Sequence, residues 1–329
     1  MKKIKASVIA LLVLTTIIIG SYLYLLYPQA IPEPSLSASL QSKTILLNGH
    51  QRTFHYYVPQ KLKSEPALVF VFHSSLSSGK KMRERTAYQF DVIADKEGFI
   101  VAYPDGYDRH WNDCRASADY AANIENINDV VFVTQMRNWF SSHYGINTKR
   151  VYATGYSNGG HLSFRLAMET PNLVAAIAPI AANLPVTKNL DCKPKGQAIS
   201  ISLFNGTADS FNPYEGGLVS ILGNESRGEV LSSKDTINYW LKLAGYQNVL
   251  EIRKKITDSN KSDQSTIEIS TWQQEGGPEI NLYTIMGGGH SIPSKLVSLG
   301  GLFGDTNADI ESALEIWNFF ERDWQQQHK

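Results

Sequence analysis

The chain has 329 residues, of which 43% are hydrophobic and 19% charged, and this is the composition of a globular protein that can bury a sizeable core. Lysine plus arginine and aspartate plus glutamate both number 31, so the formal net charge is zero. A balanced charge gives no indication of a nucleic-acid partner or of a strongly acidic one. A polar or uncharged small molecule fits better as the ligand.

The N-terminus combines a basic start with an apolar run. Three lysines stand among the first five residues, and residues 6–27 are largely apolar. About 20 apolar residues can span a bilayer, whereas the core of a signal peptide has only about 7–15 residues. The length favours an uncleaved membrane anchor over residues 1–27, with its basic end in the cytoplasm and the remaining chain exported. A signal peptide cleaved near Ala30 is the alternative, and it would leave a secreted or periplasmic protein.

Residues 28–43 contain three prolines and four serines, and we expect them to form a linker. After the linker, strand-like and helix-like runs alternate to the end of the chain. This order predicts one α/β domain over residues 44–329, with a mainly parallel sheet and helices on both of its faces. The expected strands are 54–58, 67–73, 99–103, 151–154, 175–181, 199–204 and 280–285, and the expected helices are 81–96, 127–143, 159–169, 234–244 and 309–325. The polar stretch 257–265 is expected to be a solvated hairpin or loop.

Ser157 is the most informative residue of the chain. A short β-prone run at 151–154 leads into the sequence Gly-Tyr-Ser-Asn-Gly at 155–159, and a helical apolar pattern follows. To expose its hydroxyl at the edge of a sheet, a serine nucleophile must lie on a sharp turn from strand to helix, where the flanking glycines remove colliding Cβ atoms. The same three-position pattern also occurs by chance in ordinary loops, so Ser157 needs partners.

His290 is the candidate base. A serine hydroxyl is a weak nucleophile unless a histidine, oriented by a carboxylate, accepts its proton, and in α/β-hydrolases the chain order is serine, acid, histidine. Downstream of Ser157 the histidines are His161, His290 and His328. His161 follows the serine too closely on the same helix, and His328 lies in a polar tail. His290 ends a β-prone run that breaks into three glycines, which would place the base on a loop.

Asp209 is the candidate acid. It comes just after a strand-like run at 198–204, at the edge of the sheet where Ser157 and His290 are expected. Asp191, in a loop rich in proline and lysine, and Asp235, at the start of an expected helix, are weaker candidates. The alternative for Asp209 is a turn-capping role before Pro213.

Through several ordered blocks the chain resembles the polyhydroxybutyrate depolymerase and feruloyl or acetylxylan esterase group of α/β-hydrolases. The blocks are Tyr-Val-Pro at 57–59, Tyr-Pro-Asp-Gly at 103–106 with Trp-Asn at 111–112, the glycine-serine motif at 155–160, Gly-Thr-Ala-Asp at 206–209 with Pro-Tyr-Glu-Gly-Gly at 213–217, and Gly-Gly-Gly-His at 287–290. The resemblance covers most of residues 53–329. It implies an α/β-hydrolase fold with Ser157 as nucleophile, Asp209 as orienting acid and His290 as general acid and base, and no cofactor.

The oxyanion hole is expected to combine two backbone amides, those of Asn158 and Ser75. Ser75 lies in the loop after the strand-like run 67–73. The relatives usually carry His-Gly in this loop, whereas this chain has His73-Ser74. Because serine adopts fewer backbone conformations than glycine, the loop can differ from that of the relatives.

A second departure from the relatives follows the histidine. Where they commonly have Thr-Trp-Pro, this chain has Ser291-Ile292 followed by proline, which removes an aromatic wall beside the site. Trp111 and Tyr214 remain as candidates for the substrate pocket. The alternative for both is core packing, since aromatic side chains are commonly buried for stability alone.

The chain has two cysteines, Cys114 and Cys192. In an exported domain they can pair, and a disulfide at Cys114 could brace the loop that follows Trp111; two free buried thiols are the alternative. The sequence contains no cysteine and histidine cluster with the spacing of metal ligands and no glycine-rich phosphate loop. We therefore expect neither a metal nor a cofactor.

These features together predict an exported, membrane-tethered serine esterase that works through an acyl-enzyme. Hydroxyalkanoate oligomers and feruloyl or acetyl esters are candidate substrates, with soluble or oligomeric esters preferred. A serine peptidase with the same triad is one alternative, because the fold supports both reactions. A catalytically silent binding protein at the cell surface is the other.

Overall fold

The structure is a computed structural model that describes residues 13–21 and 31–327. Residues 13–21 form a helix, and the rest of the apolar run that we expect to be an anchor or a signal lies outside the described residues. Within the two described ranges, no helix has both the length and the apolar character needed to cross a bilayer.

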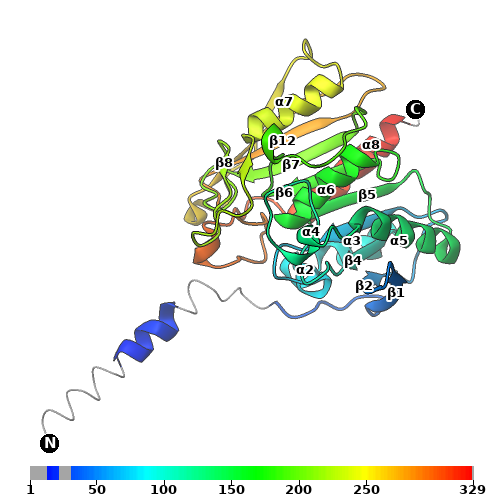
Figure 1. Cartoon of the computed structure of the whole chain (residues 1–329), viewed down its shortest axis with the longest axis horizontal. Helices are drawn as coiled ribbons and strands as arrows, with labels where there is room; N and C mark the ends of the chain where they lie inside the picture. Colours follow the sequence, from blue (N-terminus) through cyan, green and yellow to red (C-terminus); the bar gives the residue numbers. More distant parts are fainter. Residues whose placement is uncertain (1–12, 22–30, 328–329) are drawn as a thin grey trace, which may run out of the picture.

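A ten-stranded sheet forms the centre of the protein (Figure 1). Its strand order is β1-β2-β4-β3-β5-β6-β7-β12-β11-β10. The strands from β4 to β12 in this order pair in parallel, and antiparallel strands extend both edges. The strand bounds are β1 Gln41–Leu47, β2 His50–Tyr57, β3 Leu68–Phe72, β4 Ile100–Pro104, β5 Val151–Tyr156, β6 Ala176–Ile180, β7 Ser200–Gly206, β10 Ile252–Lys255, β11 Thr266–Trp272 and β12 Ile280–Met286, and a separate small sheet pairs β8 Gly217–Leu218 with β9 Glu229–Val230.

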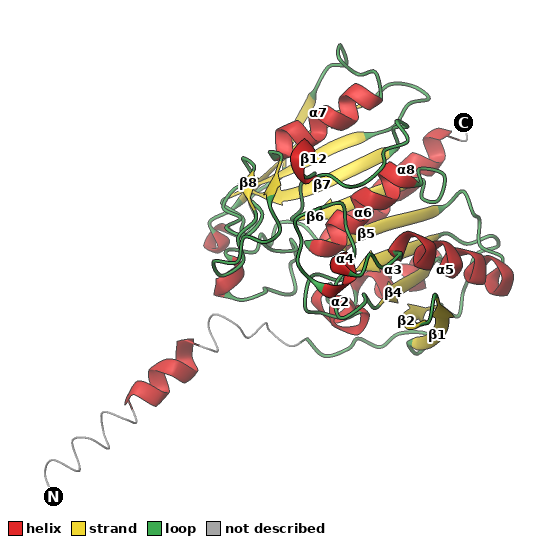
Figure 2. Cartoon of the chain, in the orientation of Figure 1, coloured by secondary structure: helices red, strands yellow, loops and turns green. Residues whose placement is uncertain are grey.

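Helices cover both faces of this sheet, as Figure 2 shows. The helix bounds are α2 Gly79–Arg85, α3 Gln89–Glu97, α4 Ala121–Ile124, α5 Asp129–Tyr144, α6 Asn158–Glu169, α7 Ser233–Leu243 and α8 Ser312–Gln327, and the 3₁₀ turns are η1 Thr187–Asn189, η2 Lys261–Asp263 and η3 Gly301–Phe303. Because side chains alternate along a strand, β3 feeds two cores. Phe70 packs in the core with α5, α6 and α7, while Val69 packs in the opposite core with α2, α3 and α8. The predicted α/β architecture, mainly parallel with helices on both faces, is confirmed.

The helix that we expected over 81–96 is two helices. Ala87 and Tyr88 have φ values of 51° and 58°, in the left-handed region that ends a helix. The break turns the chain so that the Arg83 guanidinium of α2 pairs with the buried Asp91 carboxylate of α3. The Tyr103 hydroxyl donates to the other oxygen of Asp91 at 2.8 Å. The predicted single helix is therefore interrupted, and a buried ion pair joins the two helices across the break.

The stretch expected as a linker is partly attached to the domain. β1 begins at Gln41, before the expected domain start at residue 44. Ahead of it, the backbone N–H of Ser37 donates to Asp95 at 2.8 Å, and the Tyr57 hydroxyl also contacts Asp95. The Glu33 carboxylate pairs with Arg83. We call these contacts of Glu33 and Ser37 the N-terminal clasp.

Candidate active site

Ser157 lies on a strained turn between β5 and α6. Its backbone has φ 56° and ψ −116°, a combination that is unusual for any residue other than glycine. The backbone N–H of Ser157 donates to the carbonyl of Ile180 at the end of β6 at 2.8 Å, which holds the turn against the sheet. The side chain is half-buried. The strand, the sharp turn and the helix that the motif requires are all present.

The two glycines of the motif are required for space. A Cβ on Gly155 would lie 2.4 Å from the backbone of Gly159, and a Cβ on Gly159 would lie 2.4 Å from the carbonyl oxygen of Phe72. Neither glycine has a positive φ, so the close approach of α6 to β3 and β5, and not the backbone conformation, demands them.

Replacing Gly159 with alanine is expected to lower the free energy of unfolding by about 2–3 kcal/mol, because the new methyl group would overlap the backbone of β3. Urea denaturation measures this change. Gly145→Ala is the matched control, since Gly145 has a φ of 60° but open space around its Cβ position, and its cost is expected near 1 kcal/mol. An equal effect of the two substitutions would contradict the steric explanation.

His290 and Asp209 are hydrogen-bonded to each other. The His290 Nδ1 lies 2.7 Å from Asp209 Oδ2, and the residues are 3% and 6% exposed. The other oxygen, Oδ1, accepts the backbone N–H groups of Phe211 and Asn212, each at 2.8 Å. The carboxylate is therefore fixed in one orientation. Since a carboxylate accepts, Nδ1 carries the proton and Nε2 keeps the lone pair that a general base needs.

Two loops bring these residues together by close backbone packing. A Cβ on Gly206 would lie 2.2 Å from the carbonyl oxygen of Gly288, and the N–H of Ala208 donates to that oxygen at 2.9 Å. The Tyr156 hydroxyl donates to the backbone carbonyl of His290 at 2.6 Å. The residue before Ser157 thus holds the main chain of the histidine. This role of Tyr156 is a finding that the sequence did not predict.

The Asn158 backbone N–H is in the first turn of α6, where amides have no acceptor within the helix. Its side chain is tied to the loop at Trp111: Oδ1 accepts the Trp111 N–H at 2.8 Å, and Nδ2 donates to the Trp111 carbonyl at 3.0 Å. Nδ2 also donates to Asp113 Oδ2 at 2.7 Å. These bonds hold the start of α6 in one position.

Ser75 lies in the loop after β3. The residue before it is Ser74, which stands where the relatives usually have glycine, and hydrogen bonds hold it in place. The Ser74 side chain is buried, its hydroxyl accepts Arg85 Nη1 at 2.6 Å, and its carbonyl accepts His73 Nδ1 at 2.7 Å. Serine is accommodated there because both its hydroxyl and its carbonyl have partners.

We expected Trp111 to line the substrate pocket, but it lies in the core. Its side chain is fully buried, and its Nε1 donates to the carbonyl of His73 at 2.9 Å. It therefore braces the His73 loop from inside the protein. Tyr214 is half-buried, and its hydroxyl lies 2.9 Å from Thr284 Oγ1 on β12. Ile292, where relatives commonly have tryptophan, is 1% exposed and belongs to the core with α8.

His73 is a neutral, buried histidine at the start of the loop that carries Ser74 and Ser75. Burial lowers its pKa to about 4. Its Nε2 accepts the backbone N–H of Gly106 at 2.9 Å, so its other nitrogen donates to the Ser74 carbonyl. A proton on Nε2 would break the bond to Gly106.

Stability is expected to fall as the pH falls from about 6.5 to about 4, because an unfolded histidine, with a pKa near 6.5, binds a proton that folded His73 does not. At about pH 4.5 this one residue should cost about 2 kcal/mol. Urea denaturation at pH 7 and at pH 4.5 measures the loss, and His73→Gln, whose amide oxygen can accept from Gly106, should reduce it by that amount. An unchanged loss in the variant would show that His73 is not responsible.

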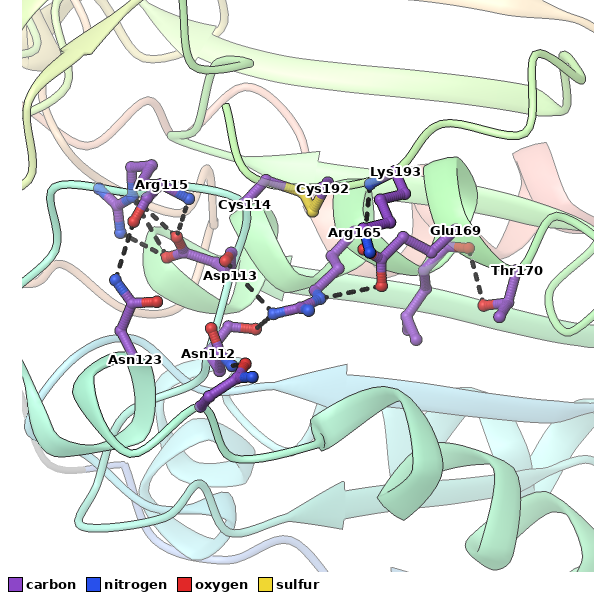
Figure 3. The surroundings of a disulfide bond; sticks show 12 residues. Asn112, Asp113, Cys114, Arg115, Asn123, Arg165, Glu169, Thr170, Cys192 and Lys193 are labelled. Carbon is purple, nitrogen blue, oxygen red and sulfur yellow. Dashed lines mark hydrogen bonds and ion pairs between the residues drawn. A yellow bond between two sulfur atoms is a disulfide. The ribbon is translucent and has the colours of Figure 1, made fainter. Parts of the chain in front are cut away.

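Cys114 and Cys192 form a disulfide, with their Cα atoms 5.0 Å apart (Figure 3). Figure 3 also shows Arg165 of α6 near the disulfide, with its side chain between Asn112 and Glu169. Its Nη1 donates to the Asn112 carbonyl at 3.0 Å, and its Nε pairs with Glu169 at 3.1 Å. The disulfide joins the loop after Trp111 to the chain at Cys192, and Arg165 bonds the first of these segments to α6.

Among residues 13–21 and 31–327 there is no group of three or more histidine, cysteine, aspartate or glutamate side chains placed to hold a metal ion.

No family model matches the sequence. The chain is similar to NocK of Nocardia uniformis subsp. tsuyamanensis, a protein named as an esterase, with 23% identity over 79% of this chain and 76% of the relative. It is 27% identical to acetylxylan esterase A of Emericella nidulans over 73% of this chain and 80% of that protein. It is also 27% identical to feruloyl esterase B of Piromyces equi, but the match spans only 40% of that protein's length.

Among solved structures, the acetyl xylan esterase from Aspergillus awamori superimposes with a TM-score of 0.55 at 18% identity, covering 86% of this chain and 99% of that one. At this identity the likeness shows the fold. The chain therefore has the α/β-hydrolase fold and is similar in sequence to acetylxylan and feruloyl esterases, the group that its motifs resemble, and these likenesses support a carboxylic ester hydrolase.

Proposed function

We propose that the protein is an exported serine esterase that hydrolyses carboxylic esters through an acyl-enzyme. Ser157 attacks the ester carbonyl while Nε2 of His290 accepts its proton. Asp209 keeps the imidazole in the required tautomer and stabilises its positive charge. His290 then protonates the leaving alcohol. A water molecule attacks the acyl-enzyme in the same way and releases the acid.

The developing negative charge on the carbonyl oxygen is stabilised in this proposal by the backbone amides of Asn158 and Ser75. The bonds that hold the Asn158 side chain to Trp111 support this role, since they fix the helix start whose amide would donate. Such donors stabilise the transition state most when they need no reorganisation during the reaction.

The observation that carries the proposal is the 2.7 Å hydrogen bond between His290 and Asp209, joined through Tyr156 to the strained turn at Ser157. A histidine with a fixed tautomer and a serine in this backbone conformation are the two parts that an α/β-hydrolase uses to activate a hydroxyl. A binding protein would gain nothing from such strain.

A fluorophosphonate probe, which reacts with activated serines, tests the nucleophile directly. We expect labelling of the intact protein and none after Ser157→Ala. Equal labelling of both would refute the assignment, and no labelling of either would favour a catalytically silent protein. For the reaction, short acyl esters should be hydrolysed faster than peptide anilides, and the opposite order would show a peptidase.

The substrate class is proposed to be soluble or oligomeric esters, such as hydroxyalkanoate oligomers or feruloyl and acetyl esters. The names of the relatives support ester substrates of this size. Comparing turnover across these three ester types identifies the class.

Export is supported by the disulfide, because such bonds form and persist in oxidising compartments. We further propose that the apolar run at 6–27 tethers the exported domain to the membrane, on the strength of its length and its basic start. Sodium carbonate extraction of membranes from cells expressing the full chain is the test. Release of the protein into the soluble fraction would refute the tether.

A further inference from the structure

Three buried polar side chains beside the proposed triad have no role in the mechanism above. They are His161, Asn212 and Arg227, which we call the buried polar group, and they are 2%, 3% and 7% exposed. Over the residues that the structure describes, His161 Nδ1, both side-chain polar atoms of Asn212, and Nε and Nη1 of Arg227 have no hydrogen-bond partner. Buried polar atoms without partners are costly and rare, so three together indicate a place for a ligand.

Each member of the buried polar group adjoins a residue of the proposed triad or its neighbour. The N–H of His161 donates to the carbonyl of Ser157 at 3.0 Å. The N–H of Asn212 donates to Asp209 Oδ1 at 2.8 Å, and its side chain lies near that of His161 without the geometry of a hydrogen bond.

Arg227 approaches the same region from the other side. Its guanidinium carbon is 6.0 Å from the centre of the Tyr120 ring, and the Tyr120 hydroxyl accepts Asn158 Nδ2 at 3.2 Å. The group therefore lies around the start of α6, where a substrate bound at Ser157 would extend.

The charges around Arg227 do not cancel. Asp113 and Arg115 neutralise each other in a fully buried pair, with Arg115 Nη2 2.6 Å from Asp113 Oδ2. The nearby Asp119 accepts the hydroxyl of Ser226 at 2.7 Å. Within residues 31–327, Arg227 has no carboxylate within 4.0 Å. One positive charge is thus left buried and unpaired, and such a charge is unfavourable until an anion joins it.

The two neutral members suit the same ligand. Burial, and then the positive charge of Arg115, lower the pKa of His161 to about 3, so its imidazole is neutral at physiological pH and can donate one hydrogen bond. The Asn212 amide offers two further donors. Arg227 and His161 both interact electrostatically with Asp113 and Arg115, which places the guanidinium in the same region as the two neutral side chains. A guanidinium with amide and imidazole donors in its region matches a carboxylate, which accepts several hydrogen bonds and binds arginine through both oxygens.

We propose that His161, Asn212 and Arg227 form a subsite for a carboxylate that the ester substrate itself carries; the proposal rests on the esterase function above. The substrates are then esters with a free carboxylate on the acyl or the alcohol side, such as half-esters of dicarboxylic acids or short hydroxyacid oligomers. Arg227 determines this preference, while Ser157 acts on the ester bond. The zero net charge of the whole chain gave no sign of such a preference.

The first test uses two matched pairs of esters, each with one neutral and one acidic member. Nitrophenyl pentanoate is paired with nitrophenyl hydrogen glutarate, which carries its carboxylate on the acyl side. Butyl acetate is paired with the acetate ester of 4-hydroxybutyrate, which carries its carboxylate on the alcohol side. We expect the kcat/KM ratio of acidic to neutral ester to fall about tenfold or more in Arg227→Gln for at least one acidic ester, and less in Arg227→Lys. Arg253→Gln, which removes an exposed arginine on β10, is the control and should keep the ratio. If Arg227→Gln keeps both ratios, the subsite is wrong and internal water satisfies these groups.

A second test does not depend on turnover. In Ser157→Ala, nitrophenyl hydrogen glutarate should raise the Tm, and in Ser157→Ala/Arg227→Gln it should raise it clearly less. An equal rise in both proteins would overturn the subsite. If instead Ser157→Ala still hydrolyses esters, the proposed nucleophile fails, while the dependence of the Tm on Arg227 still supports or refutes the subsite. Labelling of Arg227→Gln by the neutral fluorophosphonate shows that the variant is folded.

Discussion

Replacing Ser157 with alanine is expected to lower kcat for ester hydrolysis by about 10⁶-fold, with little change in stability. The hydroxyl is the only group of the site that can form the acyl-enzyme, so nothing replaces it. A residual rate above that in water would remain from the oxyanion amides and substrate binding. Steady-state kinetics with a short nitrophenyl ester measure the loss.

The matched control for this substitution is Ser163→Ala, six residues later on α6. Unlike half-buried Ser157, Ser163 is fully buried, and its hydroxyl donates to the Gly159 carbonyl at 3.1 Å within the helix. We expect full labelling by the fluorophosphonate in this control. If Ser157→Ala retained more than about one hundredth of the wild-type kcat, another group would have to be the nucleophile.

Asp209→Asn extends the same prediction to the orienting acid. The amide would keep the shape of the side chain, but it can donate to Nδ1 and so favour the wrong imidazole tautomer, and kcat should fall about 10⁴-fold. The two bonds to Phe211 and Asn212 use Oδ1, which the asparagine retains, so the loop should stay folded. If circular dichroism showed that the Asp209→Asn protein is unfolded, the loss of kcat would reflect a structural role of Asp209.

Removing the disulfide is expected to lower the free energy of unfolding by about 4 kcal/mol, since it closes a loop of 78 residues between Cys114 and Cys192. The expected loss comes mainly from the greater freedom of the unfolded chain. Urea denaturation of Cys114→Ala/Cys192→Ala against the oxidised wild type measures it. The wild type denatured in the presence of a reductant is the control and should show a similar loss.

The same double variant should also lose activity, because the disulfide restrains Cys114, the residue next to Asp113. Asp113 accepts the Asn158 side chain, and the Asn158 amide is one of the proposed oxyanion donors. Loss of stability with an unchanged kcat would show that the bond to Asn158 survives without the disulfide.

Much of the fold followed from the sequence, because buried parallel strands leave continuous apolar runs that are easy to identify. The edge strands were missed for a physical reason. β10 is a four-residue strand, Ile-Arg-Lys-Lys, whose residues are all exposed, and charged edge strands of this kind carry no apolar pattern. The break between α2 and α3 was missed because it depends on the pairing of Arg83 with Asp91, a contact that helical periodicity cannot indicate.

At the site, the sequence predicted the residues of the proposed triad but not the groups that position them. Ser157, Asp209 and His290 stand in motifs whose spacing reflects their chemistry. The hydrogen bonds from Tyr156 to His290 and from Trp111 to Asn158 join residues 134 and 47 positions apart, and no local pattern reports such contacts. The burial of Trp111 also depends on contacts with distant residues, so the sequence alone did not distinguish a core position from the expected pocket position.

With the proposed membrane anchor, the N-terminal clasp would limit how far the catalytic domain can move from the membrane. Glu33 and Ser37 are bonded to the domain, so if the proposed anchor at 6–27 lies in the bilayer, residues 28–32 span the distance between the two. From residue 27 to residue 33 there are six Cα–Cα intervals, which reach about 20 Å when fully extended. The catalytic domain would then stay within about 20 Å of the membrane surface. It would hydrolyse soluble esters that diffuse to the cell surface and could not move along an insoluble polymer.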